Sequence, residues 1–292
     1  MTSEVTVVVP SHRSARTLDA CLGALRAQET RRGYEVVVVH SGPEPLAGET
    51  ARRFPDVRFS CRPETWLPGR ARNWAIRSAT SPWLLFVDSD CVARPDWLER
   101  MVAGAERADL DGLGGAVANG SPESRLAWCM HVLEFGEWLP APGPCRPSDN
   151  FPSCNALYRR QALLAVGGFP EDVFPCEDTM LNVRLRQEGR RLGWIPGAIV
   201  AHVHNRTPAE ARRHSYQLGR TYRVACERYP MPGAFLKELP AGLALPAIVV
   251  GRLVKVAGRL ARRRPRVALR FLAGAPIALW LLVAWGRGFT AR

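Results

Sequence analysis

Apolar positions follow two periods along the first sixty residues. Runs rich in β-branched residues at 5–9, 34–39 and 57–59 predict buried strands. Between the first two strands, Leu18, Cys21, Leu22 and Leu25 recur at helical spacing after Ser14, the predicted N-cap, and 49–54 predicts a second, short helix. Strands and helices in this alternation predict a parallel sheet with right-handed crossovers.

The apolar run Trp83–Val87 gives the clearest strand pattern and ends abruptly on Asp88-Ser89-Asp90. Helical patterns flank it at 68–79 and 95–108. Ligands bind beyond the carboxyl ends of strands in open α/β sheets. Because the two carboxylates repel each other, a divalent cation with oxygen ligands is the simplest partner for them. This end of the strand is therefore a predicted metal and nucleotide-diphosphate site.

The second half of the chain has weaker patterns. They predict a strand at 112–117, a helix at 125–139 with Trp128, His131, Glu134 and Trp138 exposed along part of it, a helix from 153 to the glycines at 167–168, a helix at 177–189 and a strand at 192–201. Five prolines between 140 and 152 exclude regular structure and predict a mobile loop over a site, with a plain linker as the alternative.

Two further groups of polar residues accompany these elements. Glu177-Asp178 begins a predicted helix, where acidic residues more often serve the helix dipole than catalysis. His202 and His204 end a predicted strand on one side of it, so either could bind the metal implied at Asp88 and Asp90, although such a pair is also common as a structural or surface feature. Three such groups at the ends of predicted strands or helices in one α/β domain favour a catalytic or metal site over purely structural roles.

The first turn of the 68–79 helix carries Arg70, Arg72 and Asn73 next to the positive end of the helix dipole. Backbone N–H groups and guanidinium groups in this position suit a phosphate. A solvated basic turn is the alternative.

Composition adds a membrane signal. The 292 residues, 47% of them hydrophobic, suffice for one large or two small folded domains. The net charge of +13 is concentrated after Glu238, where no acidic residue occurs. Because this basic stretch is also apolar, it favours an anionic membrane surface over nucleic acid. The eight cysteines form no Cys-x-x-Cys pair and are expected to be buried thiols in a reducing compartment, and the N-terminus predicts no signal peptide.

The tail contains two apolar segments, Leu239–Ala257 and Val267–Trp285, and both contain charged residues. Neither is a clean twenty-residue span, and a double crossing would place the arginines of 259–266 away from the cytosol. We expect a pair of helices in the membrane plane, with Phe271, Trp280 and Trp285 dipping in. A short span at 271–285, or a helical pair packed on the catalytic domain or on a second copy in a homodimer, are the alternatives.

The order of these motifs along the chain is more specific than any single motif. Val-Val-Val-Pro-Ser-His-Arg, Gly-Arg-Ala-Arg-Asn, Phe-Val-Asp-Ser-Asp, Asn-Ala-Leu-Tyr-Arg-Arg, Gly-Gly-Phe, Cys-Glu-Asp-Thr-Met-Leu, Arg-Leu-Arg-Gln-Glu-Gly and a late histidine follow one another between Val5 and His204. This set resembles family 2 glycosyltransferases of GT-A fold. The resemblance implies a Rossmann-like mixed sheet flanked by helices, here with a helical, membrane-associating tail. It also implies segments 1–115 for the nucleotide sugar, 116–225 for acceptor and catalysis, and 226–292 for the tail.

The resemblance further implies inverting transfer from a UDP- or GDP-sugar to an acceptor hydroxyl. Asp178 matches the general base, with Glu177 as its support. Asp88 and Asp90 match the Asp-x-Asp position that binds Mn²⁺ or Mg²⁺, Asp90 more directly, and His202 or His204 would complete the metal shell. The donor-binding residues that it implies are Pro10, Ser11, Arg13, His40, Arg70, Arg72, Asn73, Asp88 and Ser89. Together with the tail, it implies a lipid-linked acceptor, no nucleic acid partner, and a location on the cytoplasmic face of the membrane.

One departure from the family pattern leaves the nucleobase open. Relatives usually carry an aspartate at the end of the second strand, where this chain has His40-Ser41-Gly42. A catalytically silent nucleotide-sugar-binding or scaffold protein is therefore the alternative. A Rossmann oxidoreductase is disfavoured, because the first strand-to-helix turn lacks the Gly-x-Gly-x-x-Gly motif. The segment 216–222 resembles the Gln-x-x-Arg-Trp motif of processive relatives too faintly to predict a polymerase.

Overall fold

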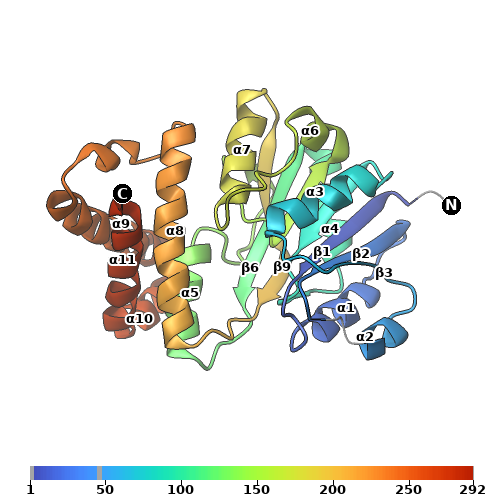
Figure 1. Cartoon of the computed structure of the whole chain (residues 1–292), viewed down its shortest axis with the longest axis horizontal. Helices are drawn as coiled ribbons and strands as arrows, with labels where there is room; N and C mark the ends of the chain where they lie inside the picture. The colour runs from blue at the N-terminus through green and yellow to red at the C-terminus, as the bar shows by residue number, and fades with distance from the viewer. Residues whose placement is uncertain (1–2, 45–47, 292) are drawn as a thin grey trace. The chain divides into compact units, whose positions relative to one another are not determined.

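The computed structural model describes residues 3–44 and 48–291. Their contacts define two compact units. The first contains Met1–Gly120, Trp138–Val173 and Glu177–Val203, and the second contains Ser121–Glu137, Phe174–Cys176 and His204–Arg292. The first is an α/β unit and the second is helical (Figure 1).

The α/β unit is built on a nine-stranded sheet with the order β3-β2-β1-β4-β8-β6-β9-β5, and β7 pairs with β9. The strands are β1 Val5–Ser11, β2 Tyr34–Ser41, β3 Arg58–Arg62, β4 Trp83–Val87, β5 Cys91–Ala93, β6 Gly112–Asn119, β7 Arg146–Pro147, β8 Asn155–Arg159 and β9 Leu192–His202. The first four strands in this order are parallel, as predicted, and β8 is antiparallel to β4 and β6. The mixed sheet expected from the resemblance is confirmed.

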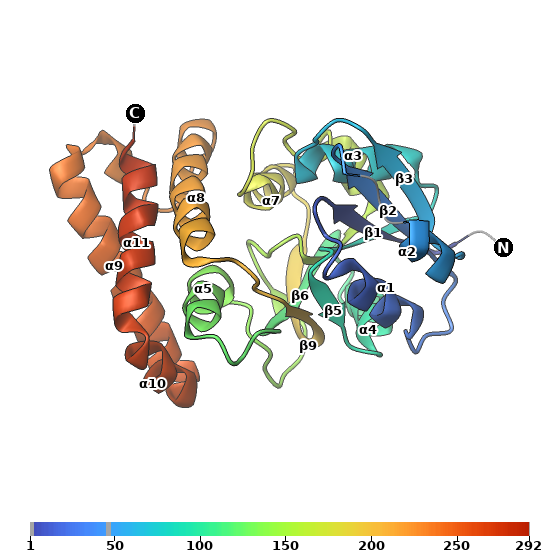
Figure 2. The ribbon, with the colours of Figure 1, turned by 60° about the horizontal axis from the view of Figure 1, so that its bottom comes forward.

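Helices cover both faces of this sheet. They are α1 Leu18–Arg26, α2 Gly48–Arg53, α3 Pro68–Ser78, α4 Trp97–Arg107, α6 Arg160–Ala165 and α7 Glu177–Gln187. Side chains alternate along each strand, so Val8 and Phe86 face one side and pack in one cluster with Ala75 of α3 and Leu181 of α7. Figure 1 shows α3, α6 and α7 on this face, and Figure 2 shows α1 and α4 on the other.

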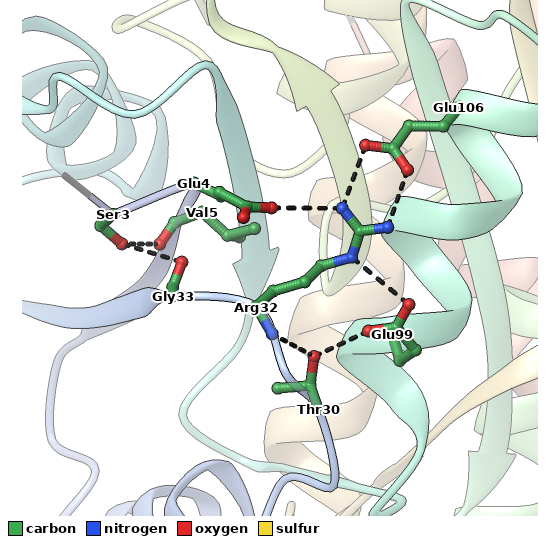
Figure 3. A network of polar contacts seen from close by, with 8 residues as sticks. All are labelled: Ser3, Glu4, Val5, Thr30, Arg32, Gly33, Glu99 and Glu106. Atoms are coloured by element: carbon green, nitrogen blue, oxygen red, sulfur yellow. Dashed lines mark hydrogen bonds and ion pairs between the residues drawn. The ribbon is translucent and has the colours of Figure 1, made fainter. Parts of the chain in front are cut away.

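One arginine ties three parts of the α/β unit together. The guanidinium of Arg32, in the loop before β2, contacts Glu4 at 3.2 Å, Glu99 at 3.4 Å and Glu106 at 2.7 Å (Figure 3). Thr30 accepts the backbone N–H of Arg32 and donates to Glu99. The hydrogen bond to Glu106 is the largest influence on Arg32 and raises its pKa, although partial burial opposes this. The network fixes the start of β1 and α4 to the same loop.

Strand β9 contains an irregularity that bears on the site. Gly115 of β6 pairs with Ile195, but the next residue, Ala116, pairs with Ile199. Three extra residues, 196–198, therefore lie on β9 between two regular stretches. The predicted strand with Pro196-Gly197 inside it is confirmed, and the pair forms part of this bulge.

The second unit consists of helices: α5 Arg125–Phe135, α8 Pro208–Arg228, the short 3₁₀ helix η1 Ala234–Glu238, α9 Ala241–Arg263, α10 Pro265–Ala273 and α11 Ala275–Thr290. Helices α8 and α11 cross at glycines. A Cβ on Gly219 would lie 1.8 Å from the carbonyl oxygen of Trp285, and one on Gly288 would lie 1.9 Å from that of Tyr216. The two backbones approach this closely because neither glycine has a side chain.

The tail differs from its prediction in two ways. The first segment forms one continuous helix, α9, which among the described residues is the single helix long and apolar enough to cross a membrane. The second segment is broken at Gly274 into two helices, α10 and α11, which meet at an angle of 80°. Only when these two helices are taken together as one segment are they long and apolar enough for a second membrane crossing. Phe271 and Trp285 were expected to dip into a membrane, but both are buried within the helical unit, where Trp285 stacks on Phe289 of α11. Trp280 remains 39% exposed.

Four other local predictions were wrong. Ser14 does not cap α1, because its hydroxyl bonds Ser11. His131 is fully buried rather than exposed. The segment 153–168 includes strand β8, since Asn155–Arg159 is enclosed between β4 and β6. The proline-rich segment contributes the two-residue strand β7. Of the cysteines, Cys21, Cys91, Cys129, Cys154 and Cys226 are buried as expected, whereas Cys61 is exposed.

Candidate active site

A buried arginine joins the two acidic motifs of the sequence. Arg72, in the first turn of α3, donates from one terminal nitrogen to Asp88 at 2.7 Å and from the other to Glu177 at 2.6 Å. Only 2% of its side chain is exposed. The pairing holds the residue after β4 beside the start of α7, two parts of the chain that lie far apart in sequence. Arg72 was expected beside the donor phosphates, but its two terminal nitrogens bind carboxylates.

The pKa values in this group follow from burial and charge. Burial raises the pKa of Glu177 to about 7, with Arg72 opposing and Asp178 reinforcing the rise. Burial alone would lower the pKa of Arg72, but the carboxylates of Asp88 and Glu177 outweigh it and the net direction is upward. Arg72 therefore stays charged, while Glu177 titrates near neutrality.

Asp178 has different surroundings from its neighbour. It is half-buried, whereas Glu177 is 3% exposed. Its Oδ2 accepts the backbone N–H of Ser153 at 3.0 Å, and its Oδ1 accepts that of Thr179 at 2.6 Å. The two N–H groups orient the carboxylate. Of the two acidic residues, Asp178 is the more exposed.

Asp90 lies beside an imidazole and a thiol. His202 Nε2 is 3.5 Å from Asp90 Oδ1, and Cys91 Sγ is 3.9 Å from the same oxygen. One ligand atom of each of these three residues lies within 4.8 Å of the others. Asp90 is 30% exposed at its side chain, while Cys91 and His202 are buried. This is a group that could hold a metal ion.

The two histidines predicted at the end of the strand are assigned to different units of the structure. His202 belongs to the α/β unit, where it pairs with Cys91 of β5 and Asn119 of β6. His204 belongs to the helical unit, where its Nε2 lies 3.1 Å from Nδ1 of His131. Since His204 follows the strand rather than extending it, the alternation that was expected to put both imidazoles on one side does not apply.

The ends of β1 and β2 meet as predicted for parallel neighbours. Ser11 Oγ lies 2.9 Å from Nδ1 of His40, and Nε2 of His40 lies 2.8 Å from the carbonyl oxygen of Glu44. Both ring nitrogens of His40 are thus engaged within the loop. Pro10 is half-buried within β1, and the exposed Arg13 has φ of 51° and lies 3.5 Å from Glu44.

The remaining predicted donor residues have varied positions. Asn73 is buried and binds both the N–H and the carbonyl of Phe169, so its amide supports the turn after α6. Arg70 is exposed and lies over the ring of Trp66 at 4.5 Å. Ser89 is half-buried between the two aspartates.

Sequence patterns alone missed three contributors. Cys91 was counted as one of several buried thiols, although its pairing with His202 places it beside Asp90. Ser153 was a loop residue without a role, and its backbone N–H orients Asp178. Arg72 was noticed as a phosphate ligand rather than as the cation between Asp88 and Glu177. Each of these roles depends on residues distant in the sequence.

Comparisons with known proteins agree with this architecture. Residues 6–167 match the family model "Glycosyl transferase family 2". The chain is 28% identical over 207 residues to the "Pre-mycofactocin glycosyltransferase" of Mycobacterium tuberculosis, an alignment that covers 69% of this chain and 43% of that protein. It is 31% identical over 207 residues to "Glycosyltransferase AglE" of Haloferax volcanii, an alignment that covers 68% of this chain and 66% of that protein. The chain thus spans less than half the length of the first of these relatives.

A solved structure shares the fold over nearly the whole chain. It is the mannosyltransferase PcManGT from Pyrobaculum calidifontis in complex with GDP-Man and Mn²⁺, with a TM-score of 0.59 and 21% identity, covering 96% of this chain and 88% of that one. The family model matches more than half of the present chain, and the fold agrees with it. The chain belongs to glycosyltransferase family 2 and has the GT-A fold.

Proposed function

We propose that the protein is a metal-dependent, inverting glycosyltransferase that moves a sugar from a nucleotide diphosphate to an acceptor hydroxyl. The observation that carries this proposal is the division between the two acidic residues at the start of α7. Glu177 is buried against Arg72, whereas Asp178 is partly exposed and its carboxylate is oriented by two N–H groups. An oriented and accessible carboxylate is what a general base requires.

In the proposed step, Asp178 accepts the proton of the acceptor hydroxyl as its oxygen attacks the anomeric carbon. The bond from that carbon to the diphosphate breaks on the opposite face, so the configuration inverts. Glu177 and Arg72 act indirectly, since they fix the start of α7 relative to the end of β4.

The residues around Asp90 fit a divalent cation by the chemistry of their donor atoms. Carboxylate oxygens suit Mn²⁺ and Mg²⁺, and the imidazole of His202 lies within reach of the same position. Asp88 is already paired with Arg72, which favours Asp90 as the direct ligand. When bound, the ion supplies Lewis-acid stabilisation of the charge that develops on the diphosphate.

We assign the donor to the UDP- or GDP-sugars. The first three parallel strands end together at Ser11, Ser41 and Arg62, the edge at which α/β sheets bind nucleotides. The structural neighbour named above was solved with GDP-Man and Mn²⁺. Because His40 is committed to Ser11 and to a carbonyl oxygen, backbone groups of this loop are the better candidates for reading the base.

The helical unit supports a membrane-bound enzyme with a lipid-linked acceptor. Leu243, Val250 and Val254 recur at helical spacing on α9 and are each more than half exposed. On α10, Leu269 and Leu272 are similarly exposed. Exposed arginines at 262, 263 and 266 lie on the same two helices, a combination that suits anionic lipid headgroups on the cytoplasmic face.

The catalytic assignment is tested with the variant Asp178→Asn in the full chain. A screen of UDP- and GDP-sugars with Mn²⁺, read by thermal shift, first identifies the donor. With that donor, Asp178→Asn is expected to lower kcat by about 10²–10⁴-fold and to leave the donor Kd nearly unchanged. Full activity of Asp178→Asn would refute the assignment.

The alternative, a catalytically silent nucleotide-sugar-binding protein, gives a different result in the same experiment. Such a protein would bind the donor, but the wild type would show neither transfer nor slow donor hydrolysis. The histidine near the end of β2, where the family resemblance leads us to expect an aspartate, is the feature that favours this alternative.

A further inference from the structure

Cys91 lies where the proposed metal ion would bind. Its Sγ is 3.9 Å from Asp90 Oδ1, which is itself 3.5 Å from His202 Nε2. Ligand atoms of the three residues all lie within 4.8 Å of one another. A carboxylate, an imidazole and a thiol thus converge on one position, and only the carboxylate is a characteristic ligand of Mn²⁺ or Mg²⁺.

Backbone pairing fixes this arrangement. Cys91 and His202 are direct partners in the antiparallel ladder between β5 and β9. Direct partners place their side chains on the same face, about 5 Å apart at Cβ. The N–H of Cys91 binds the carbonyl of Asp88, and the N–H of Val203 binds that of Asp90. The thiol and the imidazole are therefore neighbours by register rather than by a flexible rotamer.

A second thiol lies near Cys91, and the residues of this group differ in burial. The thiol of Cys154, which is 3% exposed and directly follows Ser153, is one of the groups that raise the pKa of Cys91, after burial. Cys91 itself is fully buried, whereas the Asp90 side chain is 30% exposed. A cation can therefore approach through the carboxylate of Asp90 and find nitrogen and sulfur ligands beneath it.

We propose that Asp90, Cys91 and His202 form a site for a thiophilic divalent cation of the Zn²⁺ class. Binding exchanges the thiol proton of Cys91 for the metal, so one S–H bond breaks, one S–metal bond forms and a proton leaves to water. No oxidant or reductant is needed. Nitrogen and sulfur ligands bind Zn²⁺ and Co²⁺ more tightly than Mn²⁺.

This site has a consequence that rests on the proposed function. If transfer depends on Mn²⁺ or Mg²⁺ at Asp90, a Zn²⁺ ion held by the thiolate occupies the same carboxylate and inhibits the enzyme. Cys91 would then determine which metals the protein tolerates.

The binding step is tested without any activity measurement. The full chain, reduced with a phosphine and freed of metal, is titrated with Co²⁺, whose thiolate complexes absorb in the near ultraviolet by charge transfer. We expect this absorption in the wild type, its loss in Cys91→Ser, and its retention in the matched control Cys61→Ser, which removes an exposed thiol. Addition of Zn²⁺ should abolish the band by displacing Co²⁺.

The proposal is overturned if the folded wild type gives no thiolate band, or if the band survives in Cys91→Ser. Should Cys91→Ser fail to fold, as judged by circular dichroism, Asp90→Asn serves instead, because it alters a partly exposed side chain of equal size. Its affinity for Co²⁺ should fall at least about tenfold, and unchanged affinity would contradict the assignment.

A second measurement separates this inference from the proposed function. The Zn²⁺ concentration that halves the Mn²⁺-supported transfer rate should rise at least about tenfold in Cys91→Ser and stay the same in Cys61→Ser. A thiolate band without any transfer activity would overturn the proposed function alone. Transfer activity without a thiolate band would overturn the inference alone.

Discussion

Arg72 satisfies two carboxylates that the fold brings together from the end of β4 and the start of α7. The sequence suggested that Asp88 and Asp90 require a positive partner, and a metal ion was the simplest candidate. The structure supplies an arginine for Asp88, while Asp90 lies 3.5 Å from the imidazole of His202. One acidic motif thus divides into a half that is paired with Arg72 and a half beside His202, where we propose the cation.

Removing Arg72 should destabilise the α/β unit strongly. In Arg72→Met, Glu177 loses its cation while remaining buried, so the free energy of unfolding should fall by about 3 kcal/mol at pH 8. The loss should be smaller at pH 5.5, because the Glu177 pKa of about 7 means that the carboxyl group is mostly protonated there. Urea denaturation at the two pH values measures both quantities.

Arg77→Met is the matched control for this experiment. Arg77 lies on the same helix and pairs with Glu171, but its side chain is 60% exposed. Exposed pairs of this kind contribute less than about 1 kcal/mol. If the free energy of unfolding fell equally in the two variants, burial of the Arg72 ion pairs would not contribute to stability.

At the scale of elements, the crossing of α8 and α11 depends on the absence of two side chains. In Gly219→Ala, the new methyl group would lie 1.8 Å from a backbone oxygen of α11, so the helices must separate. We expect the free energy of unfolding to fall by about 1–3 kcal/mol, measured by chemical denaturation.

Gly258→Ala on α9 provides the comparison, because nothing lies within 4 Å of its Cβ position. Alanine favours a helix over glycine by up to about 1 kcal/mol, so this variant should be neutral or more stable. If both variants had the same effect, close packing would not explain the result at Gly219.

Helix α5 contains a pH-sensitive pair with α8. Glu134 lies 3.3 Å from His214. Burial opposes its ionisation, but His214 and Arg206 outweigh burial and lower the pKa of Glu134 to about 2. Since the usual value is 4.5, the stabilisation is complete above about pH 4.5 and is lost as the pH falls towards 2.

Glu134→Gln should remove this pH dependence. The wild type should exceed the variant in free energy of unfolding by about 2–3 kcal/mol at pH 6, and the difference should shrink towards pH 3. Urea denaturation across this range measures it, with the exposed Glu123→Gln as control. If the difference in free energy of unfolding between wild type and variant did not change with pH, the titration of Glu134 would not be its cause.

At the scale of the whole molecule, the basic and apolar surfaces of α9 and α10 predict membrane binding that depends on charge. The 292-residue chain should sediment with vesicles that contain phosphatidylglycerol and less with pure phosphatidylcholine. Replacing Arg262, Arg263 and Arg266 by glutamine should weaken binding to the anionic vesicles by about 100-fold at low salt, since each charge contributes about 1 kcal/mol.

The matched control replaces three exposed arginines of the α/β unit, Arg16, Arg31 and Arg52, by glutamine. Both triple variants carry the same net charge. If they lose affinity equally, binding follows the overall charge and the surface of α9 and α10 has no special role.

Prediction from the sequence succeeded where a local pattern determines the outcome. Trp83–Val87 is apolar enough to be a central strand in any context, and the glycine stop after α7 defines that helix. Prediction failed where a distant partner decides. Strand β8 exists because β4 and β6 enclose it, and Trp285 is buried because α8 and α11 approach at two glycines.

The candidate site shows the same division. Asp88, Asp90, Asp178 and His202 stand at the ends of recognisable elements, so their positions alone suggested chemistry. The pairing of Arg72 with Glu177 and the register that sets Cys91 opposite His202 link residues about one hundred positions apart. No pattern within one element contains that information.

The bulge in β9 separates two stretches of the strand that are each paired in regular register. Ile195 and Ile199 pair with the consecutive residues Gly115 and Ala116, so they face opposite sides of the sheet although four residues apart. Side-chain alternation is therefore interrupted within residues 196–198, and the side on which His202 lies is set by its pairing with Cys91 and Asn119. The length of this segment can vary while that pairing keeps the imidazole where it is.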